Sequence, residues 1–270
     1  MIFLNNEEIN FEQFPNGETR VPTPLPIRRD NHITFKYETD ADLVHLMFLK
    51  KKLDAEGAAD VGLHIMYMPY SRQDRVEGDS TFTLKYVCEF INSLNFSIIS
   101  VEEPHSEVTP ALLERCDSHN LSVMIAGMSM DKIGFDPQND VIFFPDAGAQ
   151  KRYANNFDKC KQAVGFKHRN FQTGRIESYQ ILGEIPIGSK VVIVDDLCSY
   201  GGTFNAAAAG LKDAGAGDIY LVVAHCEDNI FKGSLLKDGS NIKKVFTTNT
   251  MLTFESDDNI HVFNLLGGSH

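Results

Sequence analysis

A chain of 270 residues exceeds the usual span of one domain, about 100 to 200 residues, and its 43% hydrophobic content is that of a folded protein. The net charge of −12 excludes nucleic-acid binding over a broad surface, and five scattered cysteines without a CxxC pair exclude a disulfide framework and a zinc knuckle. The sequence holds no run of about 18 apolar residues and begins without a signal-peptide pattern, so we expect a cytoplasmic protein that does not enter a membrane.

Short β-rich runs alternate with helical stretches along the chain, and this rhythm predicts parallel sheets. Residues 40–56 have apolar side chains at helical spacing, and the Ala-rich residues 203–215 end in glycine as a crossover helix should. The expected strands cover residues 63–68, 96–100, 140–144, 191–194 and 219–224.

The order strand, polar loop, helix occurs in both halves of the chain, which predicts two similar α/β domains. We place an N-terminal domain at residues 1–121 and a C-terminal domain at residues 122–266. Residues 267–270 are interpreted as a remnant of an expression tag. Ligands of such sheets bind beyond the carboxyl ends of the strands, so the loops there are the candidate sites.

The strongest motif is VVIVDDLCSYGGT, residues 191–203, in which a buried strand leads into two aspartates and a glycine turn. Asp195 and Asp196 can accept hydrogen bonds from two ribose hydroxyls or hold a cation. The turn lets backbone N–H groups approach a phosphate at a helix N-terminus. The alternative is a strand-end aspartate that only caps a helix.

This motif resembles the ribose-phosphate loop of the phosphoribosyltransferase fold, and further motifs from Phe14 onward resemble those of ribose-phosphate pyrophosphokinases, the phosphoribosyl-pyrophosphate synthetases. The resemblance implies two similar phosphoribosyltransferase-like domains, each with a mainly parallel sheet flanked by helices. It also implies a ribose-phosphate site formed by Asp195, Asp196, Ser199, Tyr200, Gly201, Gly202 and Thr203.

Two further segments resemble the ATP-binding parts of that family, which makes the N-terminal half the expected ATP-binding half. The stretch MPYSRQDR matches the family's Pro-Tyr-x-Arg-Gln-Asp-Arg/Lys pattern, and it would bring Arg72, Gln73, Asp74 and Arg75 to the nucleotide. The stretch FPNGE resembles a loop that crosses a subunit interface to hold adenine with Phe14, Asn16 and Glu18. This implies a homo-oligomer, a dimer or a hexamer of dimers. Taken alone, the first stretch is an ordinary solvated loop and the second an ordinary turn.

The same resemblance implies a Mg²⁺ cofactor and a pair of catalytic cations. His105, after an expected strand, and Asp146, in FPDAGAQKR, would be the metal ligands, although Mg²⁺ prefers oxygen. Lys167 and Arg169 match the family's Lys-x-Arg at the base of a mobile catalytic arm, where cations stabilise the oxygens of a phosphoryl group in transfer.

The activity implied is transfer of the β,γ-diphosphate of ATP to the anomeric hydroxyl of ribose 5-phosphate at a cleft between the domains. Three departures from the family pattern bear on it. Ser199 and Tyr200 replace an Asp-Thr pair, which leaves a larger acceptor such as ADP-ribose, in NAD salvage, as an alternative. Only thirteen residues precede Phe14, so a trimmed N-terminal domain is expected. The segment VEGDSTFT, residues 76–83, lacks the family's allosteric stretch, so weak or absent allostery is expected.

Two other functional classes remain open from the sequence. A phosphoribosyltransferase shares the 191–203 motif but needs neither the Phe14 nor the Arg72 segment. A non-catalytic regulatory homologue is expected to lose catalytic groups, whereas His105, Asp146, Lys167 and Arg169 are all present.

Overall fold

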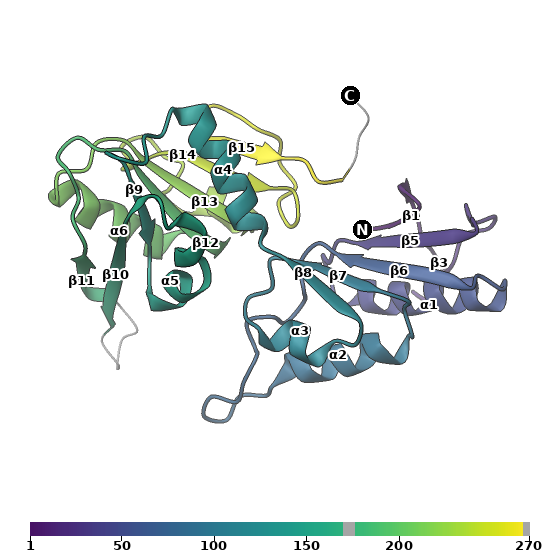
Figure 1. Cartoon of the computed structure of the whole chain (residues 1–270). Helices are drawn as coiled ribbons and strands as arrows, with labels where there is room; N and C mark the ends of the chain where they lie inside the picture. The colour runs from purple at the N-terminus through teal and green to yellow at the C-terminus, as the bar shows by residue number, and fades with distance from the viewer. Residues whose placement is uncertain (170–175, 267–270) are drawn as a thin grey trace. The chain divides into compact units, whose positions relative to one another are not determined.

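The computed structural model describes residues 1–169 and 176–266, and these form two compact units (Figure 1). Unit 1 comprises Met1–Asn120 together with Leu266, and unit 2 comprises Leu121–Leu265. The supposed tag remnant, residues 267–270, lies outside the described residues. Within the described part of the chain, no helix is long and apolar enough to cross a bilayer.

The sheet of unit 1 has the strand order β2-β1-β5-β6-β7-β8. Strands β5 to β8 are parallel, while β1 runs antiparallel to both of its neighbours. Their bounds are β1 Ile2–Leu4, β2 Glu7–Glu8, β5 Asp30–Phe35, β6 Asp60–Ile65, β7 Ile99–Glu102 and β8 Cys116–His119. A separate small hairpin pairs β3 (Glu12–Gln13) with β4 (Thr19–Arg20).

The helices of unit 1 lie along one side of its sheet, as Figure 1 shows. They are α1 (Ala41–Ala55), α2 (Thr83–Ser93) and α3 (Val108–Leu112), and their apolar side chains share one hydrophobic cluster with the sheet. The side chains of β5 alternate accordingly, because Ile33 and Phe35 are fully buried toward the helices while His32 is exposed.

The sheet of unit 2 has the order β11-β10-β9-β12-β13-β14-β15 and is parallel except for β11. The bounds are β9 Val141–Phe144, β10 Lys161–Arg169, β11 Ile176–Leu182, β12 Val191–Cys198, β13 Ile219–Cys226, β14 Ile242–Thr248 and β15 Ile260–Phe263. Every side chain of β9 and β13 is buried, as expected of strands covered on both faces.

Two hydrophobic clusters, one on each face, hold the sheet of unit 2. One contains the apolar side chains of α6 (Gly202–Asp213), and the other those of α4 (Leu121–Ile133) and α5 (Ala147–Tyr153). Two short 3-10 helices, η1 (Ala154–Phe157) and η2 (Asp228–Lys232), follow α5 and β13. The α/β class with mainly parallel sheets flanked by helices is thereby confirmed.

The helices expected at residues 40–56 and 203–215 are confirmed within two residues at each end, as α1 and α6. The limits of three strands were wrong. The strand expected at 63–68 lies at Asp60–Ile65, and the one expected at 96–100 lies at Ile99–Glu102. The strand expected at 191–194 continues to Cys198 and so includes both aspartates. Met66, Tyr67 and Met68 are buried in the loop after β6, and a buried apolar loop cannot be told from a strand by composition.

Candidate functional site

The paired aspartates of unit 2 lie near the carboxyl end of β12, at the edge where ligands of such sheets bind. The Asp195 carboxylate accepts a hydrogen bond from the backbone N–H of Asp196 over 2.9 Å. Below it, the Ser122 hydroxyl donates to the Asp195 carbonyl over 2.8 Å and accepts from the Ala224 N–H over 3.2 Å. The first turn of α4 therefore fixes the backbone of Asp195, a role of Ser122 that the sequence did not indicate.

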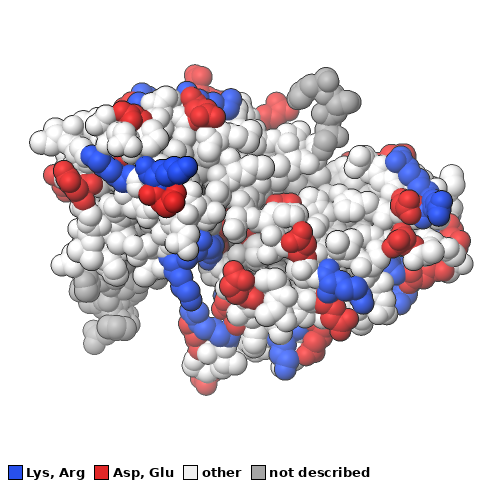
Figure 2. Space-filling model, in the orientation of Figure 1, with Lys and Arg blue, Asp and Glu red and all other residues white. Residues whose placement is uncertain are grey.

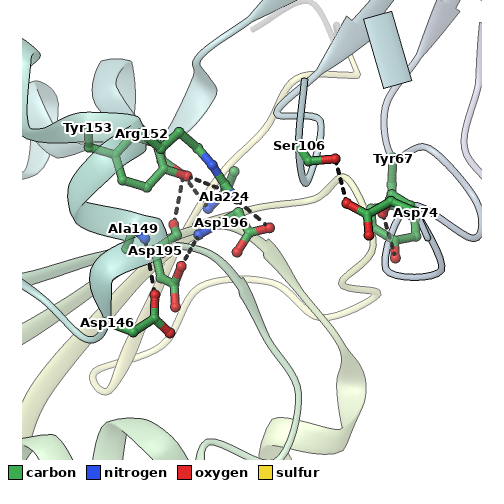
Figure 3. Close-up of polar contacts among 12 residues, drawn as sticks. Tyr67, Asp74, Ser106, Asp146, Ala149, Arg152, Tyr153, Asp195, Asp196 and Ala224 are labelled. Carbon is green, nitrogen blue, oxygen red and sulfur yellow. Dashed lines mark hydrogen bonds and ion pairs between the residues drawn. The ribbon is translucent and has the colours of Figure 1, made fainter. Parts of the chain in front are cut away.

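A third carboxylate and one cation complete this group (Figure 3). Asp146 follows β9 and caps α5, where its Oδ1 accepts from the Ala149 N–H over 3.1 Å. Arg152, on the same helix, forms an ion pair of 3.2 Å with the buried Asp196. Asp146 and Arg152 belong to one short helix, so α5 delivers both a negative and a positive group to the aspartate pair.

The pKa of Asp195 is raised well above its usual value. Burial contributes most, and the negative charges of Asp196 and Asp146 add to it. A cation or hydroxyl donors that reach such a carboxyl stabilise its charged form and lower its pKa again. Binding of either is therefore favourable at this position. The three carboxylates therefore fit a ligand rich in hydroxyl groups, a cation, or both.

The glycine turn after β12 is built for close approach of the backbone. Gly201 has φ of 81°, and a Cβ at this position would lie 2.1 Å from the Leu235 side chain. α6 begins at Gly202, so its N-terminus opens beside the turn and favours an anion there.

The residues before the turn are held by the end of β13. The Ser199 hydroxyl donates to a Glu227 carboxylate oxygen over 2.5 Å, and the Asn229 amide donates to the same oxygen over 2.8 Å. Tyr200 is 55% exposed, and a Cβ at Gly233 would lie 2.2 Å from its carbonyl oxygen. Glu227 was missed by the sequence reading, and its only signal was its place directly after a buried strand.

Lys167 and Arg169 belong to the last residues of β10, paired with the start of β11. Their side chains lie outside the described residues, as do residues 170–175. Lys151, next to Arg152 on α5, is exposed.

In unit 1, the loop after β6 carries Arg72, Gln73, Asp74 and Arg75 around a cavity of about 290 Å³, which Glu77, Ser80 and Thr81 also line. Gln73 accepts from the Thr83 hydroxyl over 2.6 Å, and the Arg75 guanidinium is paired with Glu77 over 2.6 Å. The loop is therefore tied to the start of α2. Its arginines and its cavity suit an anionic ligand with polar edges.

A hydrogen bond joins this loop to the loop after β7, which contains His105. The Ser106 hydroxyl donates to Asp74 over 2.6 Å, and only 10% of the Asp74 side chain is exposed (Figure 3). The sequence did not single out Ser106. The bond places the expected nucleotide loop and the loop of an expected metal ligand side by side within unit 1.

The hairpin of β3 and β4 presents residues 14–18 at an exposed tip. Phe14 is 50% exposed, Gly17 has φ of 87°, and the Glu18 N–H donates to the Asn16 side chain over 3.2 Å. An aromatic ring held open on a hairpin fits contact with a ligand or another chain.

The donor set fits Mg²⁺ only with help from a substrate. Among residues 1–169 and 176–266, no group of three or more His, Cys, Asp or Glu side chains is arranged to hold a metal ion. Mg²⁺ commonly binds through one or two carboxylates together with substrate phosphates, and Asp146 beside Asp195 can supply such oxygens.

The comparisons with known proteins point to the same family as the sequence motifs. The family model described as "Phosphoribosyl transferase domain" matches residues 147–260. A ribose-phosphate pyrophosphokinase of Staphylococcus haemolyticus is 27% identical over 249 residues, covering 89% of this chain and 76% of the relative. One of Methanosarcina acetivorans is 27% identical over 255 residues, covering 91% and 85%.

A solved structure agrees at the level of the fold. The phosphoribosylpyrophosphate synthetase from Mycobacterium smegmatis superposes with a TM-score of 0.78 at 20% sequence identity, covering 96% of this chain and 86% of that chain. An identity this low supports the architecture, and the chemistry rests on the residues described above.

Proposed function

The chain belongs to the ribose-phosphate pyrophosphokinase family, and we propose that it transfers the β,γ-diphosphate of ATP to the anomeric hydroxyl of ribose 5-phosphate. The products are phosphoribosyl pyrophosphate and AMP. The observation that carries this proposal is the group of three carboxylates beside the glycine turn, with the raised pKa of Asp195.

In this proposal unit 2 binds the acceptor. Asp195 accepts hydrogen bonds from a ribose hydroxyl, and Asp196, oriented by Arg152, accepts from its neighbour. The 5-phosphate lies in the turn of Ser199, Tyr200, Gly201, Gly202 and Thr203, against the N-terminus of α6.

Unit 1 binds ATP. Arg72 and Arg75 contact the phosphates, while Gln73 and Asp74 supply hydrogen bonds to ribose or adenine. Phe14 stacks on adenine in a second copy of the chain, with Asn16 and Glu18 at the edge of the base. Asp146 of unit 2 would offer carboxylate oxygens to Mg²⁺, and His105 of unit 1 is the other candidate ligand that the resemblance implies. Mg²⁺ would supply positive charge that offsets the charge on the phosphates.

In the chemical step, the anomeric oxygen attacks the β-phosphorus in line with the bond to the α,β-bridging oxygen. The new O–P bond forms as that bridging bond breaks, its electron pair leaves with AMP, and the hydroxyl proton passes to solvent. Lys167 and Arg169 stabilise the negative charge on the transferred oxygens, so they act on kcat.

The proposal is tested by following AMP formation from ATP and Mg²⁺ with and without ribose 5-phosphate. We expect release that depends on the acceptor, and a loss of about 100-fold in kcat/KM for Asp195→Asn, because the ribose hydroxyls lose their charged acceptor. Lys159→Gln, an exposed change on the same unit, is the matched control. Equal AMP release with and without acceptor would reject the proposal.

The catalytic cations are tested separately by Lys167→Ala. A contact made only in the transition state lowers kcat by about 100-fold and leaves the KM for ATP within about twofold. An unchanged kcat would remove Lys167 from that role.

The role of Phe14 in a neighbouring copy is tested by complementation. Phe14→Ala and Arg72→Ala are each expected to be nearly inactive, since each lacks one half of the nucleotide site. Mixed oligomers restore activity if the two residues meet across an interface, because one site in the hybrid is then intact. A mixture as inactive as its components would contradict the shared site.

A larger acceptor, ADP-ribose, is the second candidate, and the exposed ring of Tyr200 beside the glycine turn favours it. ADP-ribose also carries a free anomeric hydroxyl, and the Tyr200 ring would give a stacking surface to the adenine at the far end of its 5-substituent. An acceptor screen separates the two: preference for ADP-ribose that Tyr200→Thr abolishes would support the larger acceptor. A preference for ribose 5-phosphate that the variant leaves unchanged would reject it.

A further inference from the structure

Unit 2 contains a cavity of about 540 Å³ near the amino ends of its strands, whereas the glycine turn follows the carboxyl end of β12. It is lined by the end of α4 and the first residues of β13 and β14, with side chains from Lys132, Tyr220, Lys243, Lys244, Phe246 and His261. In a parallel sheet the amino ends of the strands lie away from their carboxyl ends. The cavity is therefore distinct from the group around Asp195.

The floor of this cavity is aromatic. Tyr220 and Phe246 are 6% and 2% exposed, and their ring centres are 6.3 Å apart. The partly exposed His261 ring meets the Phe246 ring at 5.8 Å and the Phe263 ring at 4.6 Å, nearly edge to face in both pairs. The packing fixes the plane of His261 and gives the cavity a rigid ring surface.

Two lysines bring charge to this cavity that no carboxylate neutralises directly. Lys132 and Lys244 form no ion pair with any residue that the structure describes, and the Lys244 ammonium donates only to the Asp257 carbonyl, over 3.3 Å. The third lysine is compensated, since Lys243 pairs with Asp218 over 2.6 Å.

Asp258 also lines the cavity and carries a carboxylate there. The net charge of the lining is positive in a chain whose net charge is −12. On the face shown in Figure 2, cationic and acidic side chains are interspersed.

The positive charges of these lysines affect the pKa of His261. Its pKa is lowered by burial and then by the positive charges of Lys132 and Lys244. Lys243, with its Asp218 partner, Asp258 and the Tyr220 hydroxyl are the other polar groups that line the cavity or lie beside it. The positive charge of the two lysines is therefore felt inside the cavity, at the His261 ring.

We propose that this cavity binds a phosphorylated small molecule with a planar ring, its phosphate between Lys132 and Lys244 and its ring against His261. The volume lies in the range of small-ligand sites, about 300–1,000 Å³. Lysine ammonium groups suit a phosphate as point charges, and the aromatic floor suits a flat ring. This site goes beyond the proposed transfer reaction and uses none of its residues.

Uridine 5′-monophosphate is a suitable probe because it is neither substrate nor product of the proposed reaction. The readout is the pKa of His261, followed by histidine NMR in the full chain, with inorganic phosphate and uridine as separate arms. The nucleotide dianion offsets the lysine charges, so we expect it to raise the pKa of His261. Phosphate alone is expected to do so more weakly, and uridine not at all.

The double variant Lys132→Gln/Lys244→Gln is expected to weaken binding by about tenfold or more, while Lys159→Gln leaves it unchanged. Both variants should retain transfer activity, which separates this site from the proposed function. A His261 pKa that millimolar nucleotide leaves unchanged would overturn the proposal, as would equal binding by the double variant. If inorganic phosphate and the nucleotide bind with equal affinity, the proposed contact between the planar ring and His261 is wrong.

Discussion

The sheet of unit 2 has a hydrophobic cluster on both faces, whereas the sheet of unit 1 has one on a single face. Consecutive residues on one strand of each sheet show the difference. In unit 2 the consecutive residues Val192 and Ile193 on β12 are both fully buried, each in a different hydrophobic cluster. In unit 1 the consecutive residues His32 and Ile33 on β5 differ in burial, since Ile33 is fully buried and His32 is exposed. A continuous apolar strand thus indicates two covered faces, and an alternating strand indicates one.

The other face of the unit 1 sheet carries a polar network instead of a second core. The Glu102 carboxylate is bonded to the His64 ring over 2.9 Å and to the His119 ring over 3.1 Å. The His32 ring lies 6.0 Å from that of His64. The stability of this face therefore depends on the ionisation of Glu102 and the histidines, whereas the stability of both faces of the unit 2 sheet depends on apolar packing.

The largest effects are expected from alanine substitutions at the four compared positions. Ile193→Ala should cost about 2–5 kcal/mol and Val192→Ala about 2 kcal/mol, because each leaves a cavity in a filled cluster. Ile33→Ala should also cost about 2–5 kcal/mol, while His32→Ala should stay within about 0.5 kcal/mol. Hydrogen exchange of peptides from each strand measures each unit separately. A large cost for His32→Ala would break the comparison.

Asp195→Asn should sharpen the contrast between stability and function within unit 2. The folded-state pKa of Asp195 lies above its unfolded value, so its stabilising contribution is present below the unfolded pKa and is lost as the pH rises through the folded one. Above the unfolded pKa, ionisation of Asp195 is therefore disfavoured in the folded chain, and we expect Asn, which cannot ionise, to make the protein more stable at pH 7 by about 1 kcal/mol.

Urea unfolding between pH 4 and 8 measures this effect, and the gain should shrink toward acid pH. The matched variant is Asp158→Asn, an exposed aspartate of the same unit, which should change stability by less than about 0.5 kcal/mol. A destabilised Asp195→Asn at pH 7 would contradict the cause assigned to the raised pKa.

Much of this architecture is predictable because its signals are local. Helices α1 and α6 follow from apolar spacing and a terminal glycine, and β12 follows from its buried run. The strand before Met66 was misplaced because the buried loop after β6 has the composition of a strand.

The candidate site is predictable only in part. The 191–203 motif indicates its own ligand-binding role, but Ser122, Ser106 and Glu227 have no local signal. Each acts through a hydrogen bond to a residue at least 28 positions away, and such pairs appear only when the chain is folded.

A smaller effect is expected from Glu102→Gln in unit 1. Burial alone would raise the pKa of Glu102, but hydrogen bonds and charge from His64 and then His119 outweigh it, and the pKa is lowered. The stability that Glu102 contributes is therefore present above its unfolded pKa and lost as the pH falls through the folded value.

We expect Glu102→Gln to destabilise unit 1 by about 1 kcal/mol at pH 7, and the difference to vanish at acid pH. Glu114→Gln, on a side chain that is 64% exposed, is the control and should stay within about 0.5 kcal/mol. A cost that persists unchanged at acid pH would show that the charge of Glu102 is not its source.

The smallest effect concerns His32, whose pKa is lowered by burial and by the neighbouring His64. Its ring lies over Gly62, where an added Cβ would be 3.2 Å from the His32 Nδ1. Because the folded-state pKa is the lower one, protonation favours the unfolded chain, and unit 1 loses stability as the pH falls from 7 toward 5. His32 also remains in contact with solvent, so screening keeps this loss below about 0.5 kcal/mol. His32→Gln should flatten the dependence of unit 1 stability on pH in that range, as measured by hydrogen exchange. A slope that the variant leaves unchanged would assign the acid sensitivity of this face to the Glu102 network alone.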